Sequence, residues 1–338
     1  MKRIKLLFAS SFEVLFVDRD LAIRRVEEWA EKSTYPVQVV FGPEGCGKTA
    51  WLRQSAVFLK ELGFDVLYFN PVEKEFLFEI GFSDLRKEFL SIVEEAAKIN
   101  AFAGVAWRLI DFAKKAIAHG SKKLAILVDD AFQVIGLDKA AIYVKGLLGV
   151  LEYPPKAYEK IVVVATTSEG LSRFEIGRHR WANLLPMWNL SKNGFEELYN
   201  QLPSPKPDFE EVWRATGGNP SVLENLYKNN LSIDRVVKEI VSRKRLRDFI
   251  ARLGAEERKW LVEAIEDPDT LYTRSRMSLK DELVKLNLII DDIPPREEFL
   301  WIDTPPPEKD LELGIGKYVA WQTPLHREAV KKALEIFN

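Results

Sequence analysis

The chain has 338 residues, of which 47% are apolar and 30% are charged, a composition typical of a globular protein with room for two or three domains. A formal net charge of −2 excludes a global basic field that would recruit nucleic acid or acidic membranes. The single cysteine excludes a disulfide framework and predicts a reducing, cytoplasmic location, and no apolar run is long enough to span a membrane.

The N-terminal residues combine a basic start with an apolar run, as a signal peptide does. Glu13 interrupts that run, and no small-residue cleavage site follows it. We therefore interpret the segment as a strand or an arm of the folded protein.

The strongest signal in the chain is residues 42–49, which read Gly-Pro-Glu-Gly-Cys-Gly-Lys-Thr and complete the phosphate-loop pattern G-x-x-x-x-G-K-[ST]. The glycines let the backbone turn its N–H groups toward a phosphate, where a side chain would block the approach. Lys48 brings a cation to the β and γ oxygens, and the Thr49 hydroxyl can ligate Mg²⁺. The expected nucleotide contacts of this segment are Gly42, Pro43, Glu44, Gly45, Cys46, Gly47, Lys48, Thr49 and Ala50.

The segments on either side of the loop fit this interpretation. Residues 37–41 form a short, β-branched apolar run, which predicts a buried strand that leads into the loop. From Thr49 to Leu62, apolar residues recur at helical spacing. The anion would then lie at a helix N-terminus, where the N–H groups and the helix dipole both favour it. The motif predicts binding of ATP with Mg²⁺.

From residue 37 to residue 190, short apolar strands alternate with helical segments, the pattern of a doubly wound α/β fold. The expected strands are 37–41, 66–69, 124–128, 161–165 and 184–188. We expect residues 1–190 to form a P-loop ATPase core with an additional-strand parallel sheet.

The strand expected at 124–128 ends in two carboxylates. Parallel strands deliver their C-terminal ends to the ligand crevice, so Asp129 would hold Mg²⁺, directly or through water. Asp130 would polarise the attacking water. The alternative, that the pair only terminates a buried strand, stays open for Asp130.

The next strand ends in a polar segment, in which Thr167 and Ser168 are candidates for reading the γ-phosphate or the attacking water. Ordinary capping of a turn is an equal alternative. Arg173, Arg178 and Arg180 follow, and one of them could stabilise charge on the transferred phosphoryl group, in this chain or in a neighbouring subunit. Solvated surface arginines are the alternative for each.

After residue 190 the pattern becomes helical. Ser191 and the residues after it predict an N-cap, and the Pro-rich residues 202–207 predict a stiff hinge. Further helices are expected over 195–202, 209–215, 222–227 and 233–241. We expect a helical lid subdomain over residues 191–244.

Residues 245–338 show helices followed by a small hairpin, which predicts a winged-helix domain. The expected helices are 256–265, 279–286 and 326–336, and the expected strands are 288–290, 299–302 and 318–321.

Together these residues resemble the archaeal ATPase family, a branch of the STAND class among the AAA+ relatives, over essentially the whole chain. Residues 16–20, Phe-Val-Asp-Arg-Asp, are similar to the family's Phe-Val-Gly-Arg-Glu box, and the resemblance implies that Arg19 lies beside the adenine. Here Asp18 and Asp20 replace the family's Gly and Glu.

Two further segments carry the resemblance beyond the core. Residues 218–220, Gly-Asn-Pro, are similar to the family's Gly-x-Pro turn, which implies that Pro220 contacts the base from the lid. Leu325 and His326 stand where nucleotide-switch relatives carry Met-His-Asp, which implies that His326 touches the β-phosphate of ADP. A helix-start histidine with a purely structural role is the alternative.

Two functions remain open, and both involve bound ATP. The first is a nucleotide-controlled switch between the ATPase core and the winged helix. The second is an ATP-regulated DNA-binding protein that reads DNA with the winged helix. The residues that favour the second are Arg243, Lys244, Arg245, Arg247, Arg274, Arg276, Lys280 and Lys285.

Charge counting argues against the second function, because residues 251–338 hold 13 Lys and Arg against 18 Asp and Glu. A small-molecule kinase fits less well than either, since no basic lid cluster offers a second phosphate site. The oligomeric state and any protein partner do not follow from the sequence.

Overall fold

The computed structural model describes residues 2–99, 102–168 and 170–336, and its chain divides into two units. The first unit comprises residues 1–4, 20–41 and 48–186, and the second comprises residues 5–19, 42–47 and 187–338. The phosphate loop straddles this division, because residues 42–47 belong to the second unit and Lys48 to the first. The three predicted domains remain a prediction.

The first unit is built on a sheet with the strand order β5-β4-β6-β7-β3-β8. Its strands are β3 (Val37–Phe41), β4 (Asp65–Asn70), β5 (Glu75–Glu79), β6 (Lys123–Val128), β7 (Lys160–Thr167) and β8 (Ala182–Pro186). All neighbouring strands pair in parallel except β4 and β5. Strand β7 lies between β3 and β6, so the additional-strand α/β sheet expected from the sequence is confirmed.

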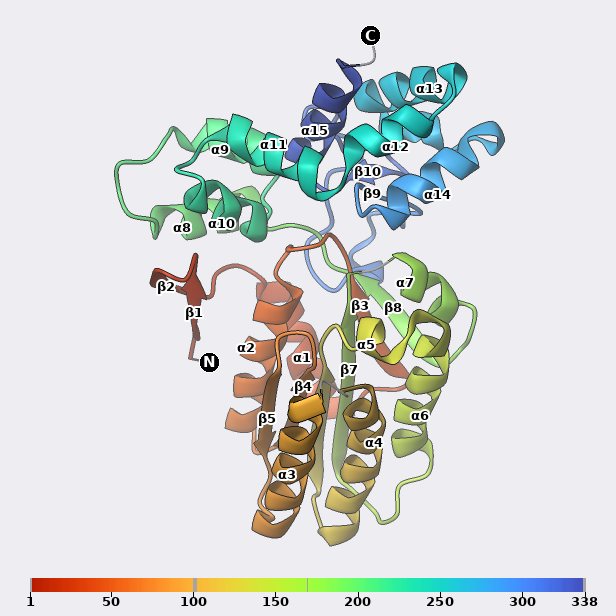
Figure 1. Ribbon diagram of the computed structural model, residues 1–338. Coiled ribbons are helices and arrows are strands. Elements are labelled where there is room, and N and C mark those ends of the chain that lie inside the picture. The colour runs from red at the N-terminus through yellow and green to blue at the C-terminus, as the bar shows by residue number, and fades with distance from the viewer. Residues whose placement is uncertain (1, 100–101, 169, 337–338) are drawn as a thin grey trace. The chain divides into compact units, whose positions relative to one another are not determined.

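Helices cover both faces of this sheet (Figure 1). They are α1 (Asp20–Lys32), α2 (Lys48–Glu61), α3 (Ser83–Ile99), α4 (Phe102–His119), α5 (Phe132–Ile135), α6 (Ala140–Glu152) and α7 (Gly170–Gly177). The strands between them are buried and rich in Val, Ile and Leu because helices exclude water from both faces.

The sequence prediction missed β5, in which Glu75–Glu79 read Glu-Phe-Leu-Phe-Glu and form an antiparallel edge strand. An edge strand needs only one buried face, and the apolar run of β5 is only three residues long, shorter than the runs that mark the central strands.

The second unit is mostly helical after residue 187. Its helices are α8 (Lys192–Asn200), α9 (Phe209–Thr216), α10 (Pro220–Lys228), α11 (Ile233–Arg243), α12 (Leu246–Arg252), α13 (Ala255–Glu266), α14 (Met277–Lys285) and α15 (Pro324–Leu334). Strands β9 (Ile289–Ile290) and β10 (Ala320–Trp321) pair antiparallel. As predicted, Ser191 caps α8, with its hydroxyl accepting from the N–H of Gly194.

The N-terminal segment is confirmed as a strand, because β1 (Lys5–Phe8) and β2 (Phe12–Leu15) form a hairpin within the second unit. Phe8 and Phe12 of this hairpin pack their rings against Tyr227 of α10.

The strand predicted at 299–302 is wrong, because residues Glu298–Leu300 form a 3₁₀ turn. Prolines on both sides, at positions 294–295 and 305–307, have no backbone N–H to donate to a sheet. Trp301 instead donates its indole N–H to the Pro295 carbonyl at 2.8 Å and is buried. Among the described residues, no helix has both the length and the apolar character needed to cross a membrane.

Candidate functional site

Lys48 is the first residue of α2, directly after the loop that follows β3. Lys48 is buried, with 4% of the residue exposed, and the adjacent Thr49 is half-buried. Because α2 begins here, its first N–H groups and the positive end of its dipole lie at the same point as the lysine. The predicted strand–loop–helix context of the motif is therefore present.

Asp129 lies just beyond β6, is fully buried, and its carboxylate is held by side chains from two neighbouring strands. Its Oδ2 accepts from the Tyr68 hydroxyl and from the Asn70 amide of β4, each at 2.9 Å. Its Oδ1 accepts from the Thr166 hydroxyl of β7. Burying a carboxylate is costly unless it is hydrogen-bonded, and these three donors offset that cost.

Asp130 has left-handed backbone geometry, with φ at +46°. Its N–H donates to the Thr166 hydroxyl at 3.3 Å, and the Ser168 hydroxyl donates to its Oδ1 at 3.5 Å. Non-glycine residues in this region store strain, and such strain is common where a side chain must be aimed. The structure thus brings Ser168 to Asp130, as a shared site would require.

The Thr167 hydroxyl lies 2.7 Å from the Ser172 hydroxyl of α7, and both side chains are buried. Thr166, which the sequence analysis did not select, is the threonine that contacts both carboxylate residues. The pairing of Val128 with Ala165 places Asp129, just after β6, beside Thr166 of β7, a register that spacing alone does not reveal.

The three candidate arginines differ in their surroundings. Arg173 stacks on the ring of Phe41, the last residue of β3, with 5.0 Å between guanidinium and ring centre. Arg178 pairs with Glu175 at 3.4 Å, and Arg180 is exposed. Arg173 thus contacts the strand that carries the loop.

Within the second unit, the loop residues Gly42 and Gly45 have no room for a side chain. A Cβ on Gly42 would lie 1.9 Å from the Met187 carbonyl oxygen. Gly45 has φ at +77°, and a Cβ there would lie 2.3 Å from the Cβ of Ser221. Both positions therefore demand glycine for packing as well as for phosphate access.

Polar side chains from distant parts of the second unit hold the same loop. The Asn219 amide donates to the Glu44 carbonyl at 2.9 Å, and the Glu44 N–H donates to the Gln322 side-chain oxygen at 2.9 Å. The Cys46 carbonyl accepts from the Arg19 guanidinium. Asn219 also caps α10, whose first residue is Pro220, so the Gly-x-Pro turn lies against the loop.

Arg19 is almost completely buried, with 1% exposed, and its guanidinium is engaged on several sides. It forms an ion pair with Asp303 at 2.8 Å and donates to the carbonyl of Trp188 at 2.8 Å. The adenine contact expected of Arg19 stays a prediction. The charge of Arg19 is compensated by Asp303, 284 residues further along the chain, a partner for which the sequence gives no local signal.

His326 occupies the first turn of α15 and is buried, with its Nδ1 2.8 Å from the Thr323 hydroxyl. Burial first, and then the nearby Lys244 and Arg243, lower the pKa of His326 to about 3. The imidazole is therefore neutral at neutral pH. It lines a cavity of about 300 Å³ together with Glu44 of the loop, Arg243 and Ser221.

The oxygen donors of the first unit suit a hard divalent cation such as Mg²⁺. Asp129 keeps one acceptor direction on Oδ1 after its three hydrogen bonds, and Thr49 offers a hydroxyl. Within the part of the chain that is described, no group of three His, Cys, Asp or Glu side chains forms a metal cage. Few protein ligands are typical for a Mg²⁺ ion that is bound together with a nucleotide.

Comparison with known proteins places the chain among nucleotide-dependent enzymes. Residues 16–226 match the family model of an ATPase domain found predominantly in Archaea. No curated protein matches the chain significantly.

Similar solved structures include a DNA replication initiation factor, with 18% identity, a TM-score of 0.38, and coverage of 79% of this chain and 73% of that one. AMPPCP-bound DnaA from Aquifex aeolicus has 20% identity, a TM-score of 0.37 and coverage of 82% and 80%. The Aeropyrum pernix Orc1 protein in complex with DNA has 14% identity, a TM-score of 0.38 and coverage of 95% and 93%. These likenesses are too distant to carry a function over.

Proposed function

The chain belongs to the family of ATPase domains found predominantly in Archaea, and from this premise we propose that it is a switch in which bound ATP or ADP controls the C-terminal region. The nucleotide would bind with Mg²⁺ at the phosphate loop. Hydrolysis would then change the contacts between this loop and the residues that hold it. ATPase chemistry follows from the family, whereas the switch is our proposal.

For the phosphate chemistry, the role of each residue follows from its surroundings. Lys48 and the N–H groups at the start of α2 would bind the phosphates, and Thr49 with Asp129 would hold the Mg²⁺ ion. The ion would supply charge neutralisation on the phosphate oxygens. Asp129 is fixed by three donors, so it would position the ion without needing to reorganise.

We expect Asp130 to serve hydrolysis more than binding. Asp130→Asn keeps the size of the side chain and its bond from Ser168, but removes the charge that would orient the attacking water. ATP affinity measured by calorimetry should change little, while turnover should fall by about 10²-fold to 10⁴-fold. Unchanged turnover would mean that Asp130 only ends the strand, and that another base must be found.

One observation in the second unit supports the proposed switch. Side chains of the C-terminal region hold the phosphate loop. Gln322 accepts from the Glu44 N–H, and Asp303 pairs with the arginine that holds the Cys46 carbonyl. A nucleotide that changes the loop's conformation must therefore alter these contacts. In thermodynamic terms, ATP and ADP would differ in how strongly they favour one arrangement of the C-terminal region.

His326 offers a direct test of the proposed nucleotide contact. A neutral imidazole can donate from Nε2 to a phosphate when Nδ1 accepts from Thr323, and a hydrogen bond to a charged group contributes about 1.5–3 kcal/mol. His326→Ala should release ADP about ten- to a hundredfold faster, measured by stopped-flow with a fluorescent ADP. In the presence of ADP it should also expose the chain near residue 245 to protease.

The matched control is His119→Ala, because His119 is an exposed histidine at the end of α4. ADP release and proteolysis that match wild type in the His326 variant would refute the contact. The histidine would then only start a helix.

ATP-regulated DNA binding is the second candidate, and ion pairing weakens it. Several basic side chains of the expected reading surface are engaged by carboxylates of the same region. The pairs are Arg245–Asp248, Arg276–Glu263, Lys280–Asp291 and Lys285–Glu282. Lys280 is also buried, with 5% exposed. A DNA backbone would have to displace these carboxylates first, which reduces the electrostatic gain.

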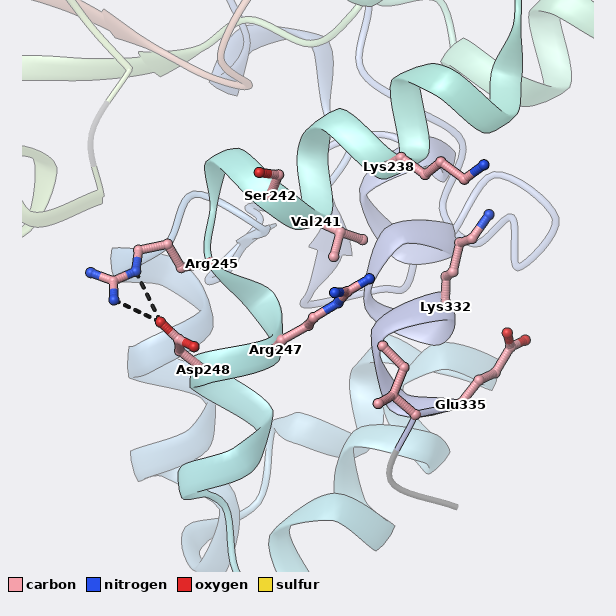
Figure 2. Close-up of a pocket in the computed structure, with 9 residues that line it drawn as sticks. Lys238, Val241, Ser242, Arg245, Arg247, Asp248, Lys332 and Glu335 are labelled. Carbon is pink, nitrogen blue, oxygen red and sulfur yellow. Dashed lines mark hydrogen bonds and ion pairs between the residues drawn. The ribbon is translucent and has the colours of Figure 1, made fainter.

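A basic pocket of about 710 Å³ between α11, α12 and α15 keeps this candidate open (Figure 2). Lys238 and Lys332 line this pocket, and both pair with Asp234, which does not line it. Among the described residues, Arg247 has no ion-pair partner, and Figure 2 shows its guanidinium extended toward α15. DNA affinity measured across a salt series, with and without ATP, distinguishes the two functions. If DNA does not bind, or binds with an affinity that does not depend on salt, the switch is the function that remains.

A further inference from the structure

The end of β4 places two donors against one oxygen of Asp129. Tyr68 and Asn70 lie two residues apart, so their side chains point to the same face of the sheet. Both donate to Oδ2, each at 2.9 Å. A carboxylate oxygen has two lone pairs, so Oδ2 has no acceptor direction left. Oδ1 accepts from Thr166 and keeps one direction.

We propose that Tyr68 is a positioning residue of the ATP site: its hydroxyl, together with the Asn70 amide, fixes the Asp129 carboxylate so that Oδ1 alone faces the magnesium ion or its water. This inference rests on the proposed Mg²⁺–ATP function. It assigns to Tyr68 a role that acts through Asp129, without contact to the nucleotide itself.

Three features of Tyr68 support a role beyond filling the core. It is 2% exposed, so no water competes for its hydroxyl. A tyrosine hydroxyl is a hydrogen-bond donor, and that of Tyr68 donates to the Asp129 carboxylate. It also lies on the strand beside β6, in register with Leu127, two residues before Asp129, so both groups are carried by rigid, paired backbone.

The neighbouring charges connect this position with the helix that follows the phosphate loop. Arg53, one turn after Thr49 on α2, pairs with Glu73, just after β4, and with Glu75, the first residue of β5. The chain after Asn70 is therefore tied to the helix that carries Lys48 and Thr49. Such a tie keeps the donors of β4 and the proposed metal ligand Thr49 in a fixed relation within the first unit.

The test compares two buried tyrosines of the same unit. Tyr68→Phe removes the donor and keeps the ring. Tyr143→Phe is the matched control, because the Tyr143 hydroxyl is buried and has no hydrogen-bond partner among the described groups. ADP affinity is measured by calorimetry with Mg²⁺ and with EDTA. The gain in affinity on adding Mg²⁺ should fall about five- to tenfold in Tyr68→Phe, while the affinity in EDTA stays at the wild-type value.

Turnover adds a second measurement, in which kcat should fall more than KM changes, because the proposed role concerns the ion and not the base or ribose. A Mg²⁺ gain equal to that of wild type and Tyr143→Phe would overturn the inference. If Tyr68→Phe does not fold, Asn70→Ala removes the other donor to Oδ2 and decides the question in the same way. Wild-type protein that binds no nucleotide with Mg²⁺ would instead refute the proposed function.

Discussion

Replacing Lys48 with Ala should weaken ATP and ADP binding at least tenfold. The side chain is buried at the start of α2, where the sequence motif aims its ammonium group at the β and γ oxygens. Hydrogen bonds to charged groups contribute about 1.5–3 kcal/mol, and the low local dielectric makes the loss of a cation facing a polyphosphate larger still. Calorimetric titration with each nucleotide in the presence of Mg²⁺ measures the effect.

The control for this variant is Lys60→Ala on the same helix. Lys60 lies in the last turn of α2, is exposed, and pairs with Glu79. Its loss should leave nucleotide affinity unchanged. A folded Lys48→Ala protein with wild-type affinity would contradict the nucleotide site and, with it, every proposal that depends on bound ATP.

Asp303→Ala should destabilise the second unit by about 3–5 kcal/mol, because it leaves the Arg19 guanidinium buried without its carboxylate. Both side chains are about 97% buried or more, so water cannot replace the lost partner. Urea unfolding, followed by the fluorescence of buried tryptophans such as Trp301, measures the change. The same variant should loosen the phosphate loop and lower ADP affinity, because Arg19 also holds the Cys46 carbonyl.

Two comparisons isolate the buried ion pair from the loss of a charge as such. Asp248→Ala removes an exposed partner of Arg245 and should cost less than about 1 kcal/mol. Replacing Arg19 and Asp303 together, as Arg19→Met with Asp303→Leu, should recover much of the stability, since no unpaired charge remains. An Asp303→Ala protein as stable as wild type would show that Arg19 finds another partner and that the pair does not secure the loop.

The hydrogen bonds and ion pairs within the C-terminal region indicate how that region is used. Asp269 accepts from three successive N–H groups, those of Lys317, Tyr318 and Val319, at 2.7, 2.8 and 3.1 Å. With the ion pairs described above, this bonding engages several polar groups of the expected winged helix internally. A region organised in this way suits contact with the phosphate loop better than capture of a polyanion.

The sequence by itself determined the central strands, the phosphate loop and Asp129. These features depend on local signals: apolar runs of strand length, helical spacing after Thr49, and a fixed motif in which each residue type answers a demand of the phosphate. A buried parallel strand that ends in a carboxylate needs no knowledge of its neighbours to be recognised. The same local reasoning failed for β5 and for residues 299–302, where one-sided burial and prolines remove the signal.

Only the tertiary structure decided which side chains surround these features. Tyr68 and Thr166 reach Asp129 from strands that lie 61 and 37 residues away in the chain. Gln322 and Asp303 reach the phosphate loop and Arg19 across separations of 278 and 284 residues. Hydrogen bonds and ion pairs extend only about 3 Å and place no periodic pattern on the sequence. Partners of this kind therefore become visible only when the strand order and the packing of the C-terminal region bring them together.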